Sequence, residues 1–433
     1  MIINSDKVNF SQEPVNRSTL IAFIAFWLGL SIFAFSYSFH REARLIFLIT
    51  WFFQFVGLAM MVSAATFVSS WKFDNIYIKF IWILTLGWYL FIVLRGFTFS
   101  FDFFNFLIFN PLFGIFIYLV PVIFLFPKKI VYLKALFSAI SLMGILYLLN
   151  NLLFFQITVL GGGGKNTAQF AVEFMSHFLA IPSGFILLTY MYHSRWRNLL
   201  ALAVVFAVFL IATINGRRGL MFISASIMVA SYLVFIATNK GKPLNIILSV
   251  FLVFFLAIFA RDAYIQRQDD AFRRINERLF ERTRTGVEEF FYRDMGPVDW
   301  VIGRGIDGKY YCPGIEMTEG HFTIYRSVIE TGYLQFVLKG GLIYLALFLL
   351  VMIPAAFKGL FLSKNLLSKA FAIWIILYLM FTYPTVINSF TPNYIIMWLA
   401  AAFCFSKSMR EKTNGQIINE LSISYHDAIN GRK

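Results

Sequence analysis

Residues 198–238 read NLLALAVVFAVFLIATINGRRGLMFISASIMVASYLVFIAT. This stretch contains two apolar runs, 198–214 and 219–238, and a very short turn that carries Arg217 and Arg218. A helix needs about 20 predominantly apolar residues to cross the hydrocarbon core of a bilayer. The pattern therefore predicts two membrane-spanning helices joined by a tight, charged turn.

The rest of the chain has the same character. Hydrophobic residues make up 59% of the 433 residues and charged residues 14%, whereas a soluble domain has about 25% charged residues. The mean hydropathy is +0.74. We therefore expect an all-α polytopic membrane protein with about 12 transmembrane helices. The apolar runs lie at roughly 19–38, 45–70, 76–94, 111–126, 130–154, 169–192, 198–214, 219–238, 243–260, 333–357, 366–385 and 389–406.

Charges in the short loops predict the orientation, because cytoplasmic loops are enriched in Lys and Arg. With a cytoplasmic N-terminus, 17 of these charges lie inside and 6 outside. The inner set is Lys7, Arg17, Lys72, Lys79, Lys128, Lys129, Lys134, Arg195, Arg197, Lys240, Lys242, Lys358, Lys364, Lys369, Lys407, Arg410 and Lys412. The outer set is Arg41, Arg44, Arg95, Lys165, Arg217 and Arg218. This bias accounts for most of the net charge of +15, so no nucleic-acid partner is expected.

One long polar segment interrupts the apolar runs and divides the chain. The expected regions are a cytoplasmic N-terminus (1–18), nine helices (19–260), an external loop (261–331), three helices (332–408) and a cytoplasmic tail (409–433). The loop holds ten Arg and one Lys. We find no repeat of a half-chain, which disfavours a transporter built from two matching halves.

Within the external loop, Gln266 to Arg284 has the spacing of an amphipathic helix. Arg267, Arg274, Arg278 and Arg282 line one of its faces. Two interpretations stay open. The face is either solvated and paired with nearby Glu residues, or it covers lipid headgroups or a channel for an anionic substrate.

Three further segments depart from a plain spanning helix. Residues 97–110 are rich in Phe and predict an interfacial helix. Pro182 predicts a kink in the sixth span. Gly340 and Gly341 predict a break between an outer helix, about 321–338, and the tenth span, because Lys339 would otherwise lie deep in the membrane.

Positive charge on the external side runs against the topology rule, so the Arg217–Arg218 turn calls for an explanation. The planar fork of Arg binds phosphate oxygens in a bidentate manner. Both residues are therefore candidates for binding a phosphate group, together with Arg304 in a Gly-Arg-Gly turn. The alternative is that the two side chains extend to the lipid headgroups.

Two pairs of residues are candidates for a functional role, the first in acid–base chemistry and the second in binding substrate in a cavity. His321 follows Glu319 by two positions, and its imidazole titrates near neutral pH. Glu173 and His177 are spaced i, i+4 and share a helix face in the outer half of the sixth span. Each pair is equally open to a plain structural explanation as local pairing. The acidic residues near His321 match no metal-ligand spacing, and we expect neither metal nor cofactor.

The layout and a few residues resemble the superfamily of Wzy O-antigen polymerases and O-antigen ligases. The ligase signature is a His, a small polar residue, nine positions and then Gly, a spacing that His321 and Gly332 keep. Phe322 replaces the small polar residue, and Gln335 stands where Gly, Thr or Tyr is expected. These departures favour polymerase over ligase. The sequence Arg217-Arg218-Gly219 looks like the Arg-Gly turn that this superfamily uses beside a lipid diphosphate.

The resemblance implies a metal-independent glycosyltransferase of the bacterial inner membrane. It would transfer a glycan from an undecaprenyl diphosphate carrier onto a lipid-linked repeat unit at the periplasmic face. Its partners would be the undecaprenyl diphosphate-linked oligosaccharide and membrane lipids, with a chain-length regulator and a flippase as further candidates. Two alternatives stay open: an O-antigen ligase, and a flippase for lipid-linked oligosaccharides.

Overall fold

The computed structural model describes residues 16–42, 47–111, 114–159, 172–239, 243, 247, 283–318, 321–385 and 389–423. Within them, seven helices are long and apolar enough to cross a membrane. The protein is therefore a multi-pass membrane protein by helix length and hydropathy. The seven candidate spans are Arg17–Ser38, Ile49–Val68, Ile76–Arg95, Ile130–Leu153, Arg195–Ile214, Arg218–Thr238 and Gly332–Phe361.

Four other expected spans form shorter apolar helices, Phe116–Leu125, Val172–Leu188, Leu366–Phe381 and Pro392–Phe405. These helices are shorter than the spans that the sequence predicted, and their packing explains the difference in length. All fourteen residues of helix α18 (Pro392–Phe405) are buried by neighbouring helices. A helix enclosed by protein need not match the thickness of the bilayer, because its ends meet protein groups rather than lipid. The expected ninth span, 243–260, lies outside the described residues except for positions 243 and 247.

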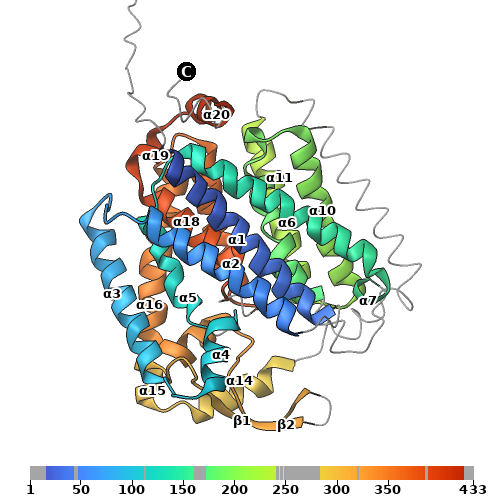
Figure 1. Ribbon diagram of the computed structural model, residues 1–433, viewed down its shortest axis with the longest axis vertical. Coiled ribbons are helices and arrows are strands. Elements are labelled where there is room, and N and C mark those ends of the chain that lie inside the picture. The colour runs from blue at the N-terminus through green and yellow to red at the C-terminus, as the bar shows by residue number, and fades with distance from the viewer. Residues whose placement is uncertain are drawn as a thin grey trace, which may run out of the picture.

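In the first half of the chain, α1, α2 and α6 run obliquely across the bundle, and α3 stands apart from them (Figure 1). Helices α1 and α2 pack against each other, and α1 also contacts α6. The short helix α4 confirms a helix within 97–110, begins after the side-chain cap of Ser100 and exposes Phe101. The elements of this half are α1 (Arg17–Glu42), α2 (Phe47–Val68), α3 (Ile76–Arg95), α4 (Phe101–Phe109), α5 (Phe116–Leu119), η1 (Val120–Leu125), η2 (Ile130–Tyr132), α6 (Leu133–Leu153) and α7 (Phe155–Thr158).

The second half completes the bundle around α18, which contacts α16, α17 and η1. The helix that begins at Val172 is interrupted by a π-helical turn, Ser176–Ala180, directly before Pro182. The helix is thus irregular next to Pro182, whereas the backbone angles of Ile181 and Pro182 themselves stay helical, so the expected kink remains a prediction. The elements here are η3 (Ser176–Ala180), α9 (Ser183–Leu188), η4 (Tyr190–Tyr192), α10 (Arg195–Ile214), α11 (Arg218–Thr238), α16 (Gly332–Phe361), α17 (Leu366–Phe381), α18, α19 (Lys407–Glu411) and α20 (Asn414–Ser422).

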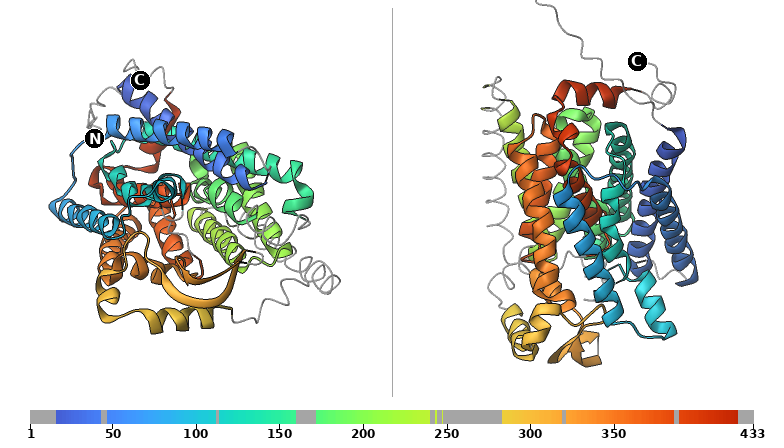
Figure 2. Two further views of the ribbon diagram at one scale, coloured as in Figure 1. Left: turned by 60° about the horizontal axis from the view of Figure 1, so that its bottom comes forward. Right: turned by 90° about the vertical axis from the view of Figure 1, so that its left-hand side faces the viewer.

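Contacts between loops define two ends of the bundle. At one end, Tyr192 donates to Asn414 Oδ1 at 2.7 Å, and Asn365 donates to the carbonyl of Met409 at 2.9 Å. Helix α20 lies across this end (Figure 2). At the other end, Asn215 donates to the Thr158 carbonyl at 3.0 Å. The loops before α10, before α17 and after α18, which the sequence predicts to be cytoplasmic, therefore meet at the α20 end.

The segment before α16 folds into a cap at the end opposite α20 (Figures 1 and 2). It contains α14 (Thr283–Asp294), α15 (Pro297–Ile302) and an antiparallel hairpin of β1 (Tyr310–Thr318) and β2 (His321–Arg326). The fold is all-α, as expected, and this short hairpin is a local addition in the cap. A small separate core, formed by Val287, Phe291, Met295, Tyr310, Cys312, Ile329, Val337 and Leu338, joins the cap to the outer part of α16.

The outer helix expected over about 321–338 is only partly correct. Residues 321–326 form a strand, and the helix begins at Gly332. The break at the glycine pair is confirmed, since Gly340 and Gly341 have φ/ψ values of −137°/15° and 69°/−174°. Backbone carbonyls freed by the break accept bonds from other segments, including Gly340 O from the indole of Trp88 at 2.8 Å. Such replacement of helical bonds permits a sharp kink at this depth.

Lys339 is the reason the kink was expected, and the cap provides its partners. Its Nζ donates to the carbonyls of Ile306 at 3.1 Å and Gly308 at 2.9 Å. The backbone of the cap meets the same turn, with Arg304 N donating to Leu338 O at 2.8 Å. The cap is therefore bonded to the kink of α16.

Candidate functional site

The Arg217–Arg218 turn has a well-defined backbone geometry. Gly216 has a φ of 64° and closes the C-terminus of α10. Its N–H bonds to Thr213 O at 3.1 Å, and Arg217 N bonds to Ala212 O at 2.7 Å. These two bonds make a Schellman motif, in which a left-handed residue, here a glycine, satisfies the last carbonyls of a helix. The motif sets the direction in which the next helix, α11, starts at Arg218.

Arg217 and Glu173 form an ion pair at this turn. Arg217 Nη1 donates to Glu173 Oε1 at 3.1 Å, and their side chains are 14% and 37% exposed. Two positive side chains at a helix N-terminus oppose the helix dipole, so a carboxylate beside them is favourable. The sequence singled out both residues but paired Glu173 with His177 rather than with Arg217.

His177 lies in the π-helical turn and takes part through its backbone. Its carbonyl accepts a hydrogen bond from Asn393 Nδ2 at 2.8 Å. Asn393 is buried near the start of α18, and among the described residues Asn393 Oδ1 has no hydrogen-bond partner. The bond joins the Glu173 segment to α18. Asn393 was not anticipated from the sequence, because an isolated Asn after Pro392 reads as an ordinary helix start.

Thr385 connects two glycines that the resemblance had singled out. A Cβ at position 219 would lie 2.5 Å from Thr385 Cγ2. A Cβ at position 332 would lie 2.6 Å from Thr382 O and 2.7 Å from Thr385 O. The starts of α11 and α16 therefore pack against the segment that follows α17. Gly219 and Gly332 leave the space for this approach.

Gln335, a departure from the ligase signature, has a structural task. Its Oε1 accepts from Ile329 N at 2.9 Å, and its Nε2 donates to Ser327 O at 3.2 Å. The buried amide thus holds the segment between β2 and α16. Gly, Thr or Tyr at this position has no side-chain amide and would not make this pair of hydrogen bonds.

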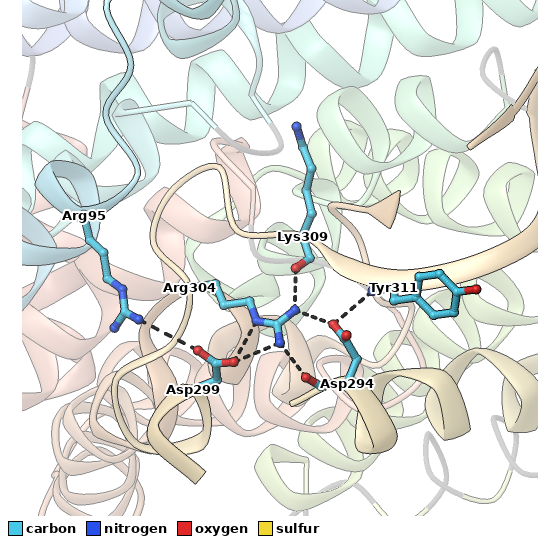
Figure 3. A network of polar contacts seen from close by, with 6 residues as sticks. All are labelled: Arg95, Asp294, Asp299, Arg304, Lys309 and Tyr311. Atoms are coloured by element: carbon cyan, nitrogen blue, oxygen red, sulfur yellow. Dashed lines mark hydrogen bonds and ion pairs between the residues drawn. The ribbon is translucent and has the colours of Figure 1, made fainter. Parts of the chain in front are cut away.

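Arg304 was expected to contact phosphate, but here it clamps the cap (Figure 3). Its Nε and Nη2 donate to Asp299 Oδ2 at 2.9 and 2.8 Å, and Nη1 donates to Asp294 Oδ2. Two further bonds reach the Lys309 carbonyl at 2.8 Å and the Asp294 carbonyl at 2.5 Å. All five guanidinium N–H groups are used. A contact with phosphate would require some of these bonds to be given up.

The carboxylates of Asp294 and Asp299 also affect the pKa of Arg304. Burial disfavours the charged guanidinium, but hydrogen bonds and charges from Asp294 and Asp299 outweigh it and raise the pKa of Arg304. Asp299 also faces Arg95 Nη2 of α3 at 3.8 Å. The network therefore ties the cap to a spanning helix.

Of the remaining predicted site residues, His321 alone lies among the described residues. His321 begins strand β2, where its backbone is in register with Thr318. Glu319, Arg274 and Arg278 lie outside the described residues. The pairing of His321 with Glu319 and the arginine face of 266–284 therefore stay predictions. Among the described residues, no group of three or more His, Cys, Asp or Glu side chains is placed to hold a metal ion.

Comparisons of the chain with models of known protein families, with curated proteins and with solved structures give no match. The chemistry of the site must therefore be argued from its own groups. Two arginines stand at the N-terminus of a 21-residue helix, at the same end of the bundle as the cap. A helix N-terminus and guanidinium groups both favour anions. We take this turn, with Glu173 and the neighbouring glycines, as the candidate site.

Proposed function

We propose that the protein is a polysaccharide repeat-unit polymerase of the bacterial inner membrane, with both termini in the cytoplasm. It transfers a glycan from an undecaprenyl diphosphate carrier onto a lipid-linked repeat unit at the periplasmic face. The observation that supports the proposal is the placement of Arg217 and Arg218 at the start of α11, at the end of the bundle that the loop charges predict to be external. The resemblance noted in the sequence adds the reaction type.

In the proposed reaction, the oxygen of an acceptor hydroxyl attacks the anomeric carbon of the donor glycan. The bond from that carbon to the diphosphate oxygen breaks, and the electron pair leaves with the diphosphate. Arg217, Arg218 and the N-terminus of α11 stabilise the departing negative charge. A diphosphate is a good leaving group, so the reaction does not require protonation of its bridging oxygen.

The acceptor proton needs a base, and His321 is our first candidate, oriented by Glu319. A positioned base contributes typically about 10²–10⁴-fold in rate. Glu173 is the second candidate. Its ion pair with Arg217 places its carboxylate beside the proposed diphosphate position. When the diphosphate binds the Arg217 guanidinium in place of Glu173, the Glu173 carboxylate becomes available to accept the proton of the acceptor hydroxyl.

A deletion strain tests the function class. Loss of long chains with one repeat unit retained on the lipid A core identifies a polymerase. Loss of all material linked to the core identifies a ligase, and retention of repeat units inside the cell identifies a flippase. Complementation with the double variant Arg217→Ala/Arg218→Ala should leave single repeats, at normal protein level. Arg195→Ala, at the exposed opposite end of α10, is the matched control and should restore long chains. Long chains from the double variant would reject the proposed site.

A further inference from the structure

The outer surface of the cap carries two exposed tyrosine rings, beside a partly buried phenylalanine ring, that the candidate site does not use. Tyr311 of β1 is 42% exposed and Tyr325 of β2 is 57% exposed. The two residues are direct partners in the hairpin register, and their ring centroids lie 5.9 Å apart at an angle of 74°. The ring of Phe290 from α14 lies 6.4 Å from that of Tyr311. We call these three residues the aromatic platform.

The platform arises from the alternation of side chains along a strand. Tyr310 and Cys312, the neighbours of Tyr311, are buried in the core of the cap, where Tyr310 packs edge-on against Phe291 at 5.4 Å. Tyr311 therefore points to the opposite face. A cross-strand pair of tyrosines that served only the core would be placed on the buried face instead.

The position of Tyr311 is supported by the network around Arg304 (Figure 3). Its backbone N–H donates to Asp294 Oδ2 at 3.0 Å, and Asp294 is held by Arg304. Arg304 in turn binds Asp299, which faces Arg95 at the end of α3. The strand that carries Tyr311 is thus linked by side chains to a spanning helix. A surface held in this way is pre-organised for a ligand.

The charge around the platform argues against an anionic partner. In residues 286–313 and 324–330, the acidic residues are Glu288, Glu289, Asp294, Asp299, Asp307 and Glu330. The basic residues are Arg293, Arg304, Lys309 and Arg326. Six acidic against four basic residues give this part a charge of 4 − 6 = −2, in a chain whose net charge is +15. Anionic lipid headgroups would be repelled rather than attracted.

The location of the hairpin points the same way. β1 and β2 lie at the extreme end of the molecule, beyond the spanning helices, in both side views (Figures 1 and 2). Exposed Tyr is common at membrane interfaces, but this hairpin lies past the ends of the spans. Exposed aromatic groups in such a place mark a binding surface for a molecule in the aqueous phase.

We propose that the aromatic platform binds the uncharged glycan part of the acceptor chain, an inference that rests on the proposed function. The axial C–H groups of a pyranose ring form an apolar face that stacks on an aromatic ring. The tyrosine hydroxyls supply hydrogen bonds to the sugar hydroxyls. The occupant is a neutral or weakly charged oligosaccharide, held outside the membrane while its end reaches the candidate site.

The test uses the full-length protein purified in detergent and an array of purified bacterial polysaccharides, both neutral and acidic. We expect binding to at least one neutral polysaccharide. The variant Tyr311→Ala/Tyr325→Ala should bind it about tenfold more weakly, because two ring contacts are lost. Tyr311→Phe/Tyr325→Phe keeps the rings and should retain most of the binding. The matched control is Tyr292→Ala, an exposed tyrosine of α14 that stacks on Trp300 at 6.0 Å.

Several results would overturn the inference. They are no binding to any polysaccharide, unchanged binding by the double Ala variant at unchanged thermal stability, or binding to anionic lipid vesicles that the same variant abolishes. In cells, the double Ala variant should give shorter chains, whereas Arg217→Ala/Arg218→Ala should give single repeats. Normal chains from the tyrosine variant alone would reject the platform and leave the proposed function standing. Loss of all core-linked material in the deletion strain, with array binding still dependent on the tyrosines, would reject the proposed function and leave the glycan surface.

Discussion

Arg217 Nη1 lies 3.1 Å from Glu173 Oε1, and this contact joins the start of α11 to the helix that begins at Val172. The pair is only partly buried, so its own contribution to stability is about 0–1 kcal/mol. The value of the contact is therefore positional. It holds one guanidinium at a helix N-terminus in a fixed orientation.

The first prediction separates a positioning role of Glu173 from a catalytic one. If Glu173 only orients Arg217, Glu173→Gln should lower the polymer yield severalfold, and the same change in an Arg217→Lys background should have little further effect. Effects on residues that act through each other are not additive. Chain length distributions in complemented deletion strains provide the measurement. Independent, multiplying effects would instead assign Glu173 a role of its own, as the base.

The second prediction concerns the two glycines packed on Thr385. Gly219→Ala should destabilise the protein by about 1–3 kcal/mol, because the added methyl group overlaps Thr385 Cγ2. Thr385→Ser removes that methyl group and keeps the hydroxyl that donates to Phe381 O at 2.9 Å, so it should rescue Gly219→Ala. It should not rescue Gly332→Ala, whose methyl group would meet carbonyl oxygens. Thermal unfolding in detergent is the measurement. Equal rescue of Gly219→Ala and Gly332→Ala by Thr385→Ser would contradict this packing.

The third prediction concerns the clamp of the cap. Arg304→Ala leaves Asp294 and Asp299 without their main partner and should cost about 3 kcal/mol. Arg304→Lys should restore little, because one ammonium cannot replace a five-donor fork. Limited proteolysis of the cap would report its detachment. Arg293→Ala, an exposed arginine on the same helix α14, is the control and should behave as the unaltered protein.

The fourth prediction concerns the base. His321→Ala should give a folded, inserted protein that accumulates single repeat units, as expected for loss of a group worth about 10²–10⁴-fold in rate. His321→Gln can keep hydrogen bonds but cannot accept the proton, so it should fail as well. Polymer of normal length from the Gln variant would show that the proton goes elsewhere, with Glu319 and Glu173 as the next residues to replace.

The fifth prediction concerns orientation. Both native cysteines, Cys312 and Cys404, are buried and free, so an introduced thiol can be labelled selectively. Val298→Cys in α15 should react with a membrane-impermeant maleimide in intact spheroplasts, and Lys407→Cys in α19 should react only after lysis. The reverse pattern would invert the topology and place the cap in the cytoplasm.

Part of this architecture followed from local sequence. Apolar runs of about 20 residues predicted the spans. The excess of Lys and Arg in every second loop predicted which loops lie together at each end of the bundle. The break at Gly340–Gly341 was also local, because a glycine pair after Lys339 offers the chain a way to turn a charge out of the membrane. So was the Arg217–Arg218 turn, whose closure needs only Gly216 and the end of α10.

What the sequence could not supply depends on contacts between distant segments. Arg304 reads as a phosphate ligand in its Gly-Arg-Gly turn, but Asp294, Asp299 and the Lys309 carbonyl arrange themselves around it only in the folded cap. The sequence paired Glu173 with His177, whereas the structure pairs it with Arg217. This pairing could not be read from the sequence, because Arg217 is 44 positions away.

The sequence by itself therefore determined that this chain is a multi-pass membrane protein and where its charged turn lies, since both depend on composition and on spacing along the chain. The tertiary structure alone decided which charges are paired, which short helices are enclosed, and that a tyrosine pair faces outward. Those properties depend on which surfaces contact each other in the folded protein, and the spacing of residues along the chain does not determine these contacts.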